Sequence, residues 1–181
     1  MADIRIENMV ASATIAEELD LAALSRVLPE SKYNPEEFPG LVLHLAEPKT
    51  AALLFRSGKM VCTGGKTYED VRRAIDMVAA MASQAGAVVH DSPEVEVQNI
   101  VASSNLGSYL DLKAIALAFG LETVEYEPEQ FPGLVYRLQE PRVVMLLFSS
   151  GKLVCTGGRT REHVEAAVDG VAADLEMKGL L

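Results

Sequence analysis

Apolar residues fill several short extended segments of this chain at nearly every position rather than at alternate ones. Segments such as AALLF, VMLLF and LVLHL show this pattern, whereas an antiparallel strand with one wet face usually alternates apolar and polar residues. Helices can cover only one face of a sheet built from such strands. The second face therefore either meets another copy or a partner, or stays exposed for binding, and a large exposed apolar face usually has a function.

The periodicities predict one order of elements twice over: strand, helix, four strands, helix. In the first half these are residues 3–11, 20–28, 33–34, 41–45, 50–55, 59–63 and 67–84. In the second half the first strand, the two helices and the short extended piece are residues 94–103, 111–119, 161–177 and 125–126. Short hairpin connections indicate antiparallel pairing. The chain is therefore predicted to be an α+β protein with ten antiparallel strands.

The two halves are near-copies of one another. Residues 53–67 read LLFRSGKMVCTGGKT and residues 146–160 read LLFSSGKLVCTGGRT, so that twelve of fifteen positions are identical. FPGLV at 38–42 likewise returns at 131–135, and the second copy has two more residues between its first helix and this motif. We expect repeats at residues 1–90 and 91–181 that form one pseudo-symmetric unit. Such an object suits a pseudo-symmetric target, of which duplex DNA is the commonest.

Two segments of the chain are basic although the chain as a whole is acidic. The formal net charge is −10, which taken alone argues against a nucleic-acid ligand. Between positions 38 and 66, however, four basic residues face one acidic residue, and between 131 and 161 five face one. The acidic residues lie mostly in the helices and before each FPG. A basic rim around an apolar sheet fits DNA approached through its minor groove.

Signals for other chemistry are weak. GGKT at 64–67 lacks the earlier glycine of a phosphate-binding loop, because Met60 occupies that position. Cys62 and Cys155 occupy equivalent positions and are expected to be free thiols on the helix-covered side, with a disulfide as the alternative. Two cysteines and three scattered histidines predict no metal site, and no catalytic arrangement recurs. With no signal peptide or bilayer-spanning run, we expect a cytoplasmic, non-enzymatic protein without cofactors.

The duplicated motifs together resemble the TATA-box-binding protein family, and in particular its archaeal members. The resemblance covers both repeats and nearly the whole chain, through VCTGG after SGK, EP before the next strand, and Phe residues 17 apart in each copy. It implies a saddle-shaped, ten-stranded antiparallel sheet with helices on the convex face. It also implies a general transcription factor that binds the minor groove of the TATA box and kinks the DNA.

The resemblance assigns residues to three kinds of DNA contact. The residues assigned to insert between base steps are Phe38, Phe55, Phe131 and Phe148. The minor-groove set is Asn8, Val10, Leu53, Val61, Thr63, Asn99, Val101, Leu146, Val154 and Thr156. Phosphate contacts are Lys49, Lys59, Lys66, Arg137, Arg142, Lys152 and Arg159. The alternatives are core aromatic residues, asparagines bonded at strand ends, and solvated surface charges.

Differences between the copies predict polarity. His44 stands where the second copy has Arg137, and Glu37 occupies a position often basic in eukaryotic relatives, so we expect a weaker phosphate grip in the first copy. Glu127 and Glu129 resemble the acidic loop that engages transcription factor B, through which RNA polymerase is recruited. Without DNA, the apolar face favours a homodimer. Two other functions remain open: an accessory nucleic-acid-binding module and a carrier of an apolar ligand.

Overall fold

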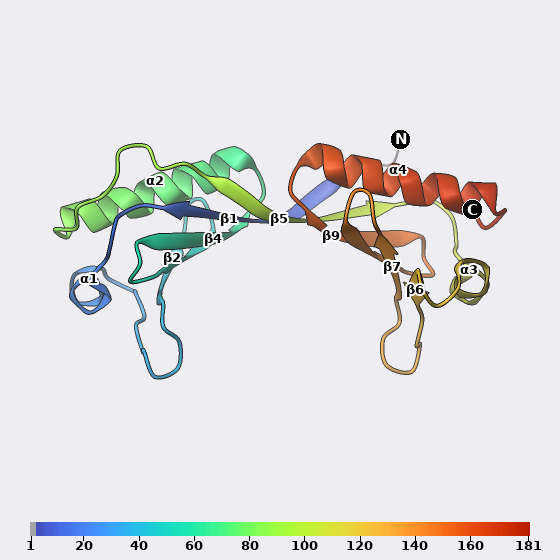
Figure 1. The fold of residues 1–181 in the computed structure, drawn as a ribbon, viewed down its shortest axis with the longest axis horizontal. Helices are drawn as coiled ribbons and strands as arrows, with labels where there is room; N and C mark the ends of the chain where they lie inside the picture. The colour runs from blue at the N-terminus through green and yellow to red at the C-terminus, as the bar shows by residue number, and fades with distance from the viewer. Residues whose placement is uncertain (1–2) are drawn as a thin grey trace. The chain divides into compact units, whose positions relative to one another are not determined.

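The computed structural model describes residues 3–181, which form two compact units. The N-terminal unit is Asn8–Gln98, and the C-terminal unit combines residues 3–7 with Asn99–Leu181. Each unit has an antiparallel sheet, one long helix across a face of that sheet and one short helix beside it (Figure 1). The fold is thus of the α+β class, as the periodicities predict.

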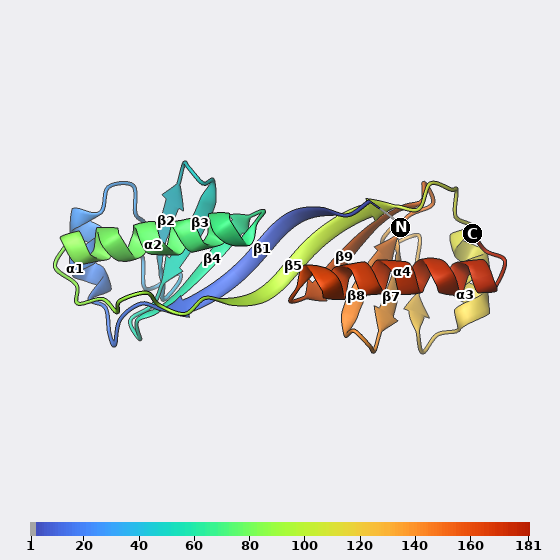
Figure 2. The same cartoon turned by 90° about the horizontal axis from the view of Figure 1, so that it is seen from above.

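In the N-terminal unit the strands lie in the order β2-β3-β4-β1. Its elements are β1 (Arg5–Thr14, which begins in the other unit), α1 (Leu21–Val27), β2 (Leu41–Leu45), β3 (Thr50–Leu54), β4 (Lys59–Gly65) and α2 (Tyr68–Gln84). Helix α2 packs on β3 and β4 and runs across the strands when seen from above (Figure 2).

In the C-terminal unit the strands lie in the order β5-β9-β8-β7-β6. Its elements are β5 (Glu96–Asn105, which begins in the other unit), α3 (Leu112–Phe119), β6 (Val124–Glu125), β7 (Leu134–Leu138), β8 (Val143–Leu147), β9 (Lys152–Gly158) and α4 (Arg161–Met177). Helix α4 packs on β9 and crosses the strands as α2 does in its own unit (Figure 2).

The prediction of ten strands is wrong by one, because residues 3–181 contain nine. The missing strand is the expected extended piece at 33–34. There the N-terminal unit makes only an isolated bridge between Lys32 and Val42, whereas β6 pairs Val124 with Tyr136 and Glu125 with Val135. The two additional residues of the second copy lie in this connection, and they give it the length to form a second rung.

Helix starts follow the capping residues. Thr67 accepts a hydrogen bond from the backbone N–H of Asp70 at 3.0 Å, and Thr160 accepts one from His163 at 3.1 Å. Each hydroxyl satisfies a backbone donor that the first helical turn leaves without a partner. Asp20 and Asp111 cap α1 and α3 in the same way. Capping chemistry in the sequence therefore sets where all four helices begin.

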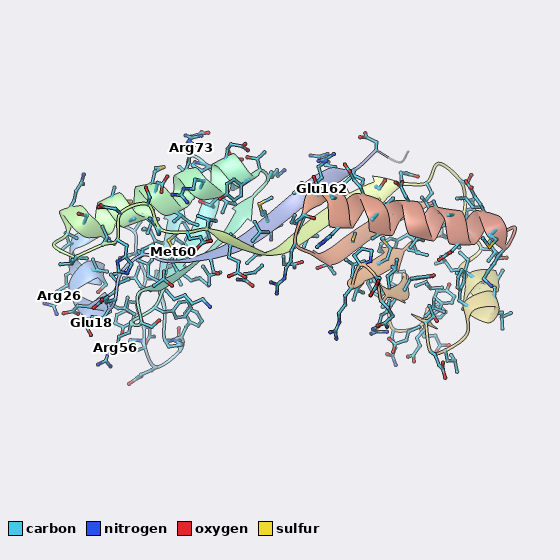
Figure 3. All side chains as sticks on the ribbon, turned by 45° about the horizontal axis from the view of Figure 1, so that its top comes forward. Glu18, Arg26, Arg56, Met60, Arg73 and Glu162 are labelled. Carbon is cyan, nitrogen blue, oxygen red and sulfur yellow. The ribbon has the colours of Figure 1, made fainter. Side chains whose placement is uncertain are left out.

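Side chains of each strand alternate between a buried and a half-exposed face. On β4, Met60 and Cys62 are completely buried beneath α2, while Val61 and Thr63 are half-exposed. Figure 3 shows Met60 at the base of α2 and Arg73 on the outer side of that helix. The half-exposed side of each sheet, which neither α2 nor α4 covers, is called the open face below. No helix among residues 3–181 has the length and apolarity to span a membrane.

Candidate nucleic-acid interface

The open face of each unit has an apolar row that crosses its strands. In the N-terminal unit Val42 pairs with Leu53, Leu53 with Val61 and Val61 with Ser12. Directly opposite residues of an antiparallel ladder point to the same side, so these four share one face. The equivalent row in the C-terminal unit is Val135, Leu146, Val154 and Ser103.

The sequence interpretation placed two members of each row on this face and missed the other two. It named Leu53 and Val61 but not Val42 or Ser12. FPGLV was recognised only as a repeat, although its valine lies one strand away from Leu53. Strand alternation within FPGLVLHL could have found it, because Leu41 and Leu43 are buried and Val42 is half-exposed.

Each unit brings its two predicted intercalating phenylalanines into contact. The rings of Phe38 and Phe55 are edge-to-face with centroids 5.9 Å apart, and those of Phe131 and Phe148 are 6.0 Å apart. Phe38 is 38% exposed and Phe131 is 41% exposed. Phenylalanine is among the residue types most often fully buried, so two phenylalanines with this exposure at equivalent positions are informative.

A glycine under each pair makes this position available. A Cβ on Gly40 would lie 2.7 Å from Phe38 Cε2, and one on Gly133 would lie 2.7 Å from Phe131 Cε2. The ring edge therefore occupies the space of the absent side chain. The third residue of each FPG motif is explained by this contact, which the sequence interpretation did not foresee. The loop carrying Phe38 projects from the sheet on the side opposite α2 (Figure 1).

The two asparagines are held by the turn at the end of the neighbouring strand. The N–H of Gly64 donates to Asn8 Oδ1 at 2.7 Å, and Asn8 Nδ2 donates to Thr63 Oγ1 at 3.3 Å. Asn99 makes the same bonds with Gly157 and Thr156, at 2.7 Å and 3.2 Å. Because the oxygen of each amide accepts from a backbone N–H, its nitrogen is directed along the open face with one further hydrogen to donate.

The glycines in this arrangement are the first of each GG pair. Gly64 has φ of +101° and Gly157 has φ of +103°, a conformation that glycine adopts at little cost. The predicted strand 59–63 was too short, because β4 continues through Gly65, which pairs with Met9. The ladder is irregular at this point, and the asparagine side chain takes a backbone donor that a regular rung would use.

The remaining predicted DNA contacts all lie at accessible positions. Val10 and Val101 are half-exposed on β1 and β5. The seven predicted phosphate contacts are all exposed: Lys49, Lys59, Lys66, Arg137, Arg142, Lys152 and Arg159. Arg137 is also 3.4 Å from the Glu125 carboxylate, an exposed pair of small energetic weight. His44, at the position equivalent to Arg137, is exposed as well.

The acidic loops before each phenylalanine have the same backbone turn with different side chains. The N–H groups of Gln130 and Phe131 both donate to the carbonyl of Glu127 at 3.0 Å. In the N-terminal unit the carbonyl of Asn34 has this role. Glu127 and Glu129 are exposed. The loops thus present the same shape and a different arrangement of charge.

The thiols take no part in this surface. Cys62 and Cys155 are free and buried on the helix-covered side. Burial raises the pKa of each thiol to about 11, so both are protonated at neutral pH. Among residues 3–181 no group of three or more histidine, cysteine, aspartate or glutamate side chains could hold a metal ion.

Comparison with known proteins gives the same result for both repeats. The family model "Transcription factor TFIID (or TATA-binding protein, TBP)" matches residues 3–85 and again residues 94–177. The chain belongs to the TATA-box-binding protein family. A TATA-box-binding protein of Archaeoglobus fulgidus is 56% identical over 98% of this chain and 97% of its own length. One from Picrophilus torridus is 54% identical over 100% of this chain and 98% of its own.

A solved structure of the TATA-box-binding protein family has the same fold. "Methanococcus jannaschii TBP" superposes with a TM-score of 0.90 at 43% identity, covering 97% of this chain and 99% of that chain. Members of the TATA-box-binding protein family are DNA-binding transcription factors and not enzymes. The resemblance inferred from the duplicated motifs is thereby confirmed.

Proposed function

We propose that this chain binds the minor groove of a promoter TATA element, bends it by phenylalanine insertion and nucleates assembly of the transcription machinery. The observation that carries the proposal is the phenylalanine pair in each unit, with one ring exposed and packed on a glycine beside an apolar face. A flat apolar side chain at the margin of such a face can enter a base step and unstack it.

Selection for A·T pairs follows from the shape and chemistry of the open face. The minor groove presents only acceptors at A·T pairs, and guanine adds an amino group. The amide nitrogens of Asn8 and Asn99 supply donors that are held in position. Bulky side chains such as Val61 and Val154 leave no room for the guanine amino group, so G·C pairs are excluded by contact.

Binding to a duplex is tested by comparing two sequences of equal length. Fluorescence anisotropy should give much tighter binding to a TATA duplex than to one in which G·C pairs replace the element. The exposed basic residues should make both affinities fall with salt, because phosphate contacts release counterions. Equal affinity for the two duplexes would refute minor-groove selection.

The wedge role is tested separately from affinity. Replacing Phe131 and Phe148 by alanine should reduce DNA bending, measured by energy transfer between dyes at the duplex ends. Tyr109→Ala is the matched control, since this tyrosine is 78% exposed and is not among the predicted DNA contacts. Unchanged bending in the double variant would exclude insertion by this pair.

Recruitment of transcription factor B is proposed to use the acidic loop of the second repeat. Glu127 and Glu129 are exposed there, and charged rim residues govern partner choice and association rate. Glu127→Gln/Glu129→Gln should weaken the complex with transcription factor B on DNA while TATA binding is retained. Glu36→Gln/Glu37→Gln makes the same charge change in the first repeat and should leave that complex intact. RNA polymerase joins through transcription factor B, so loss of that factor should also abolish polymerase recruitment.

A further inference from the structure

A groove of the N-terminal unit lies between the start of α1 and the end of α2. Its volume is about 740 Å³, which falls within the range of about 300–1,000 Å³ typical of ligand sites. One wall is the segment 17–20 with the first turn of α1, and the other is the segment that follows α2, residues 85–88 and 90. None of these residues is among the predicted DNA contacts. We call this feature the acidic groove.

Backbone hydrogen bonds hold both walls of the acidic groove. The N–H of Leu19 donates to the carbonyl of Arg56 at 2.9 Å, which fixes the wall before α1. On the opposite wall the N–H of His90 donates to the carbonyl of Ile15 at 2.7 Å, and the N–H of Ala87 bonds back into α2 at 3.0 Å. The groove is therefore formed before a ligand arrives, and a ligand need not order its walls.

The floor of the acidic groove is apolar. Leu19 and Leu24 form its base and are each 3% exposed. The short side chains of three alanines line the space above them: Ala23, Ala85 and Ala87. Val88, at the margin, is 88% exposed. An apolar hollow with an exposed valine beside it is a surface on which a partner can bury an aliphatic side chain.

The rim of the acidic groove carries carboxylates. Glu17, Glu18 and Asp20 line it together with His90, and the residues that the structure places along it include no lysine or arginine. Arg56 shares a neighbouring hollow with Glu18 and Asp20, and Figure 3 shows Glu18 and Arg56 beside α1. One arginine thus accompanies three carboxylates, so charge complementarity selects a basic ligand and disfavours an acidic one.

The second repeat has different chemistry at the matched positions. Ser108 and Tyr109 stand 91 positions after the two glutamates of the groove rim. Lys178 is the C-cap of α4, whereas the C-cap of α2 is an alanine. The Nζ of this lysine lies 5.0 Å from the centroid of the Phe119 ring. The combination of an apolar floor and an acidic rim therefore distinguishes the N-terminal unit, although the two repeats are otherwise near-copies.

We propose that the acidic groove binds a segment of a partner protein in which aliphatic side chains are flanked by lysine or arginine. The aliphatic side chains fill the apolar floor, and the flanking cations meet Glu17 and Glu18 at the rim. Burial in a formed hollow supplies affinity, and opposite charge supplies selectivity and a faster association. This inference does not rest on the proposed function, because it concerns a second interaction surface of the chain.

Model peptides test this ligand chemistry on the full chain in the absence of DNA. The probe is the blocked hexapeptide KKLLKK, and its controls are KKGGKK, which lacks aliphatic side chains, and EELLEE, which lacks positive charge. Fluorescence anisotropy should show KKLLKK binding about ten-fold more tightly than KKGGKK, because its two leucines bury apolar surface. EELLEE should not bind. In amide NMR spectra KKLLKK should shift the Gly86 signal and leave that of Gly179, the matched position of the second repeat, unchanged.

One pair of variants separates the rim from the net charge of the chain. Glu17→Gln/Glu18→Gln should weaken KKLLKK binding by about five-fold, the effect of losing two exposed charge interactions. Asp169→Asn/Glu176→Gln removes the same number of negative charges from α4 and should leave KKLLKK binding unchanged. Equal weakening by both double variants would overturn the proposal, because it would show attraction to the acidic chain as a whole.

A second pair of variants tests the floor without any change of charge. Ala23→Leu fills part of the acidic groove and should weaken KKLLKK binding, whereas Ala114→Leu makes the same change at the matched position of α3 and should not. Equal affinity for KKLLKK and KKGGKK, or parent affinity in both groove variants, would overturn the proposal. Both groove variants should keep the parent affinity for a TATA duplex, so failure of this proposal is distinguishable from failure of the proposed function.

Discussion

Gly157→Ala should affect both folding and DNA binding through one backbone position. Gly157 has φ of +103°, where a side chain with a Cβ costs about 1–2 kcal/mol. The added Cβ itself would meet nothing closer than Val143 Cα at 3.4 Å, so the cost is one of conformation rather than of crowding. Lower entropy of the unfolded alanine chain returns about 0.4–1 kcal/mol.

Relaxation of the strained backbone would also break a hydrogen bond. The Gly157 N–H donates to Asn99 Oδ1 at 2.7 Å, and such a bond contributes about 1 kcal/mol to stability. The net destabilisation should be about 1–2 kcal/mol, which lowers the melting temperature by roughly 3–6 °C for a chain of this size. Without this donor the Asn99 amide can turn, and we expect TATA affinity to fall by about five- to ten-fold, equivalent to about 1–1.4 kcal/mol.

Thermal melting by circular dichroism and anisotropy titration on a TATA duplex measure the two effects. Gly170→Ala is the control, because this glycine lies within α4 and an added Cβ would be 4.0 Å from its nearest neighbour, Leu138 Cδ2. Alanine there should stabilise the helix by up to about 1 kcal/mol and leave DNA binding unchanged. A Gly157→Ala chain that melts and binds like the parent would refute the reasoning about both the backbone and Asn99.

Three further predictions concern ionisation, phosphate contact and groove chemistry. Burial raises the pKa of the Cys62 and Cys155 thiols from 9.0 to about 11, so the unfolded chain loses these protons first and stability should fall between pH 9 and 11. The fall should approach about 3 kcal/mol per thiol; urea unfolding across this range measures it, and Cys155→Ala should halve it. Lys152→Gln should weaken binding to all duplexes alike and reduce the slope of log affinity against log salt by about one, whereas an unchanged slope would exclude a phosphate contact. Asn8→Asp keeps the side-chain shape but removes the Nδ2 donors and adds a charge, so TATA affinity should fall at least about ten-fold; an anisotropy titration that gives the parent affinity would show that this amide makes no groove contact.

Local chemistry made much of the fold predictable. The repeat of LLF, SGK and VCTGG required a duplicated element order, and the capping residues Thr67 and Thr160 located the starts of the two long helices. Period-two alternation correctly separated Val61 from Cys62. The ten-strand count failed at 33–34, because whether a two-residue extended piece gains a second rung depends on the length of its connection to the neighbouring strand.

The sequence predicted only part of the candidate site. Residue types and spacing nominated Phe38 and Phe55, but nothing local indicated that Gly40 must lack a side chain for the two rings to meet. Val42 joins the apolar row only through its cross-strand partner Leu53. Both relationships are set by strand register, which fixes contacts between segments that the sequence lists separately.

The sequence by itself determined that the chain is built twice from one plan, that each strand has a face of small and bulky apolar residues, and that basic residues gather around the strand blocks. Those properties are local, since they follow from side-chain type and a period of two or 3.6 residues. The tertiary structure alone decided how the asparagines are oriented and which residues of neighbouring strands complete the apolar row. The bond between Gly64 and Asn8 joins residues 56 positions apart, and it exists because two strands meet in one register. The proposed interface depends on such contacts between distant strands. The sequence pattern could therefore name residue types for it, but only the folded chain shows how they are arranged.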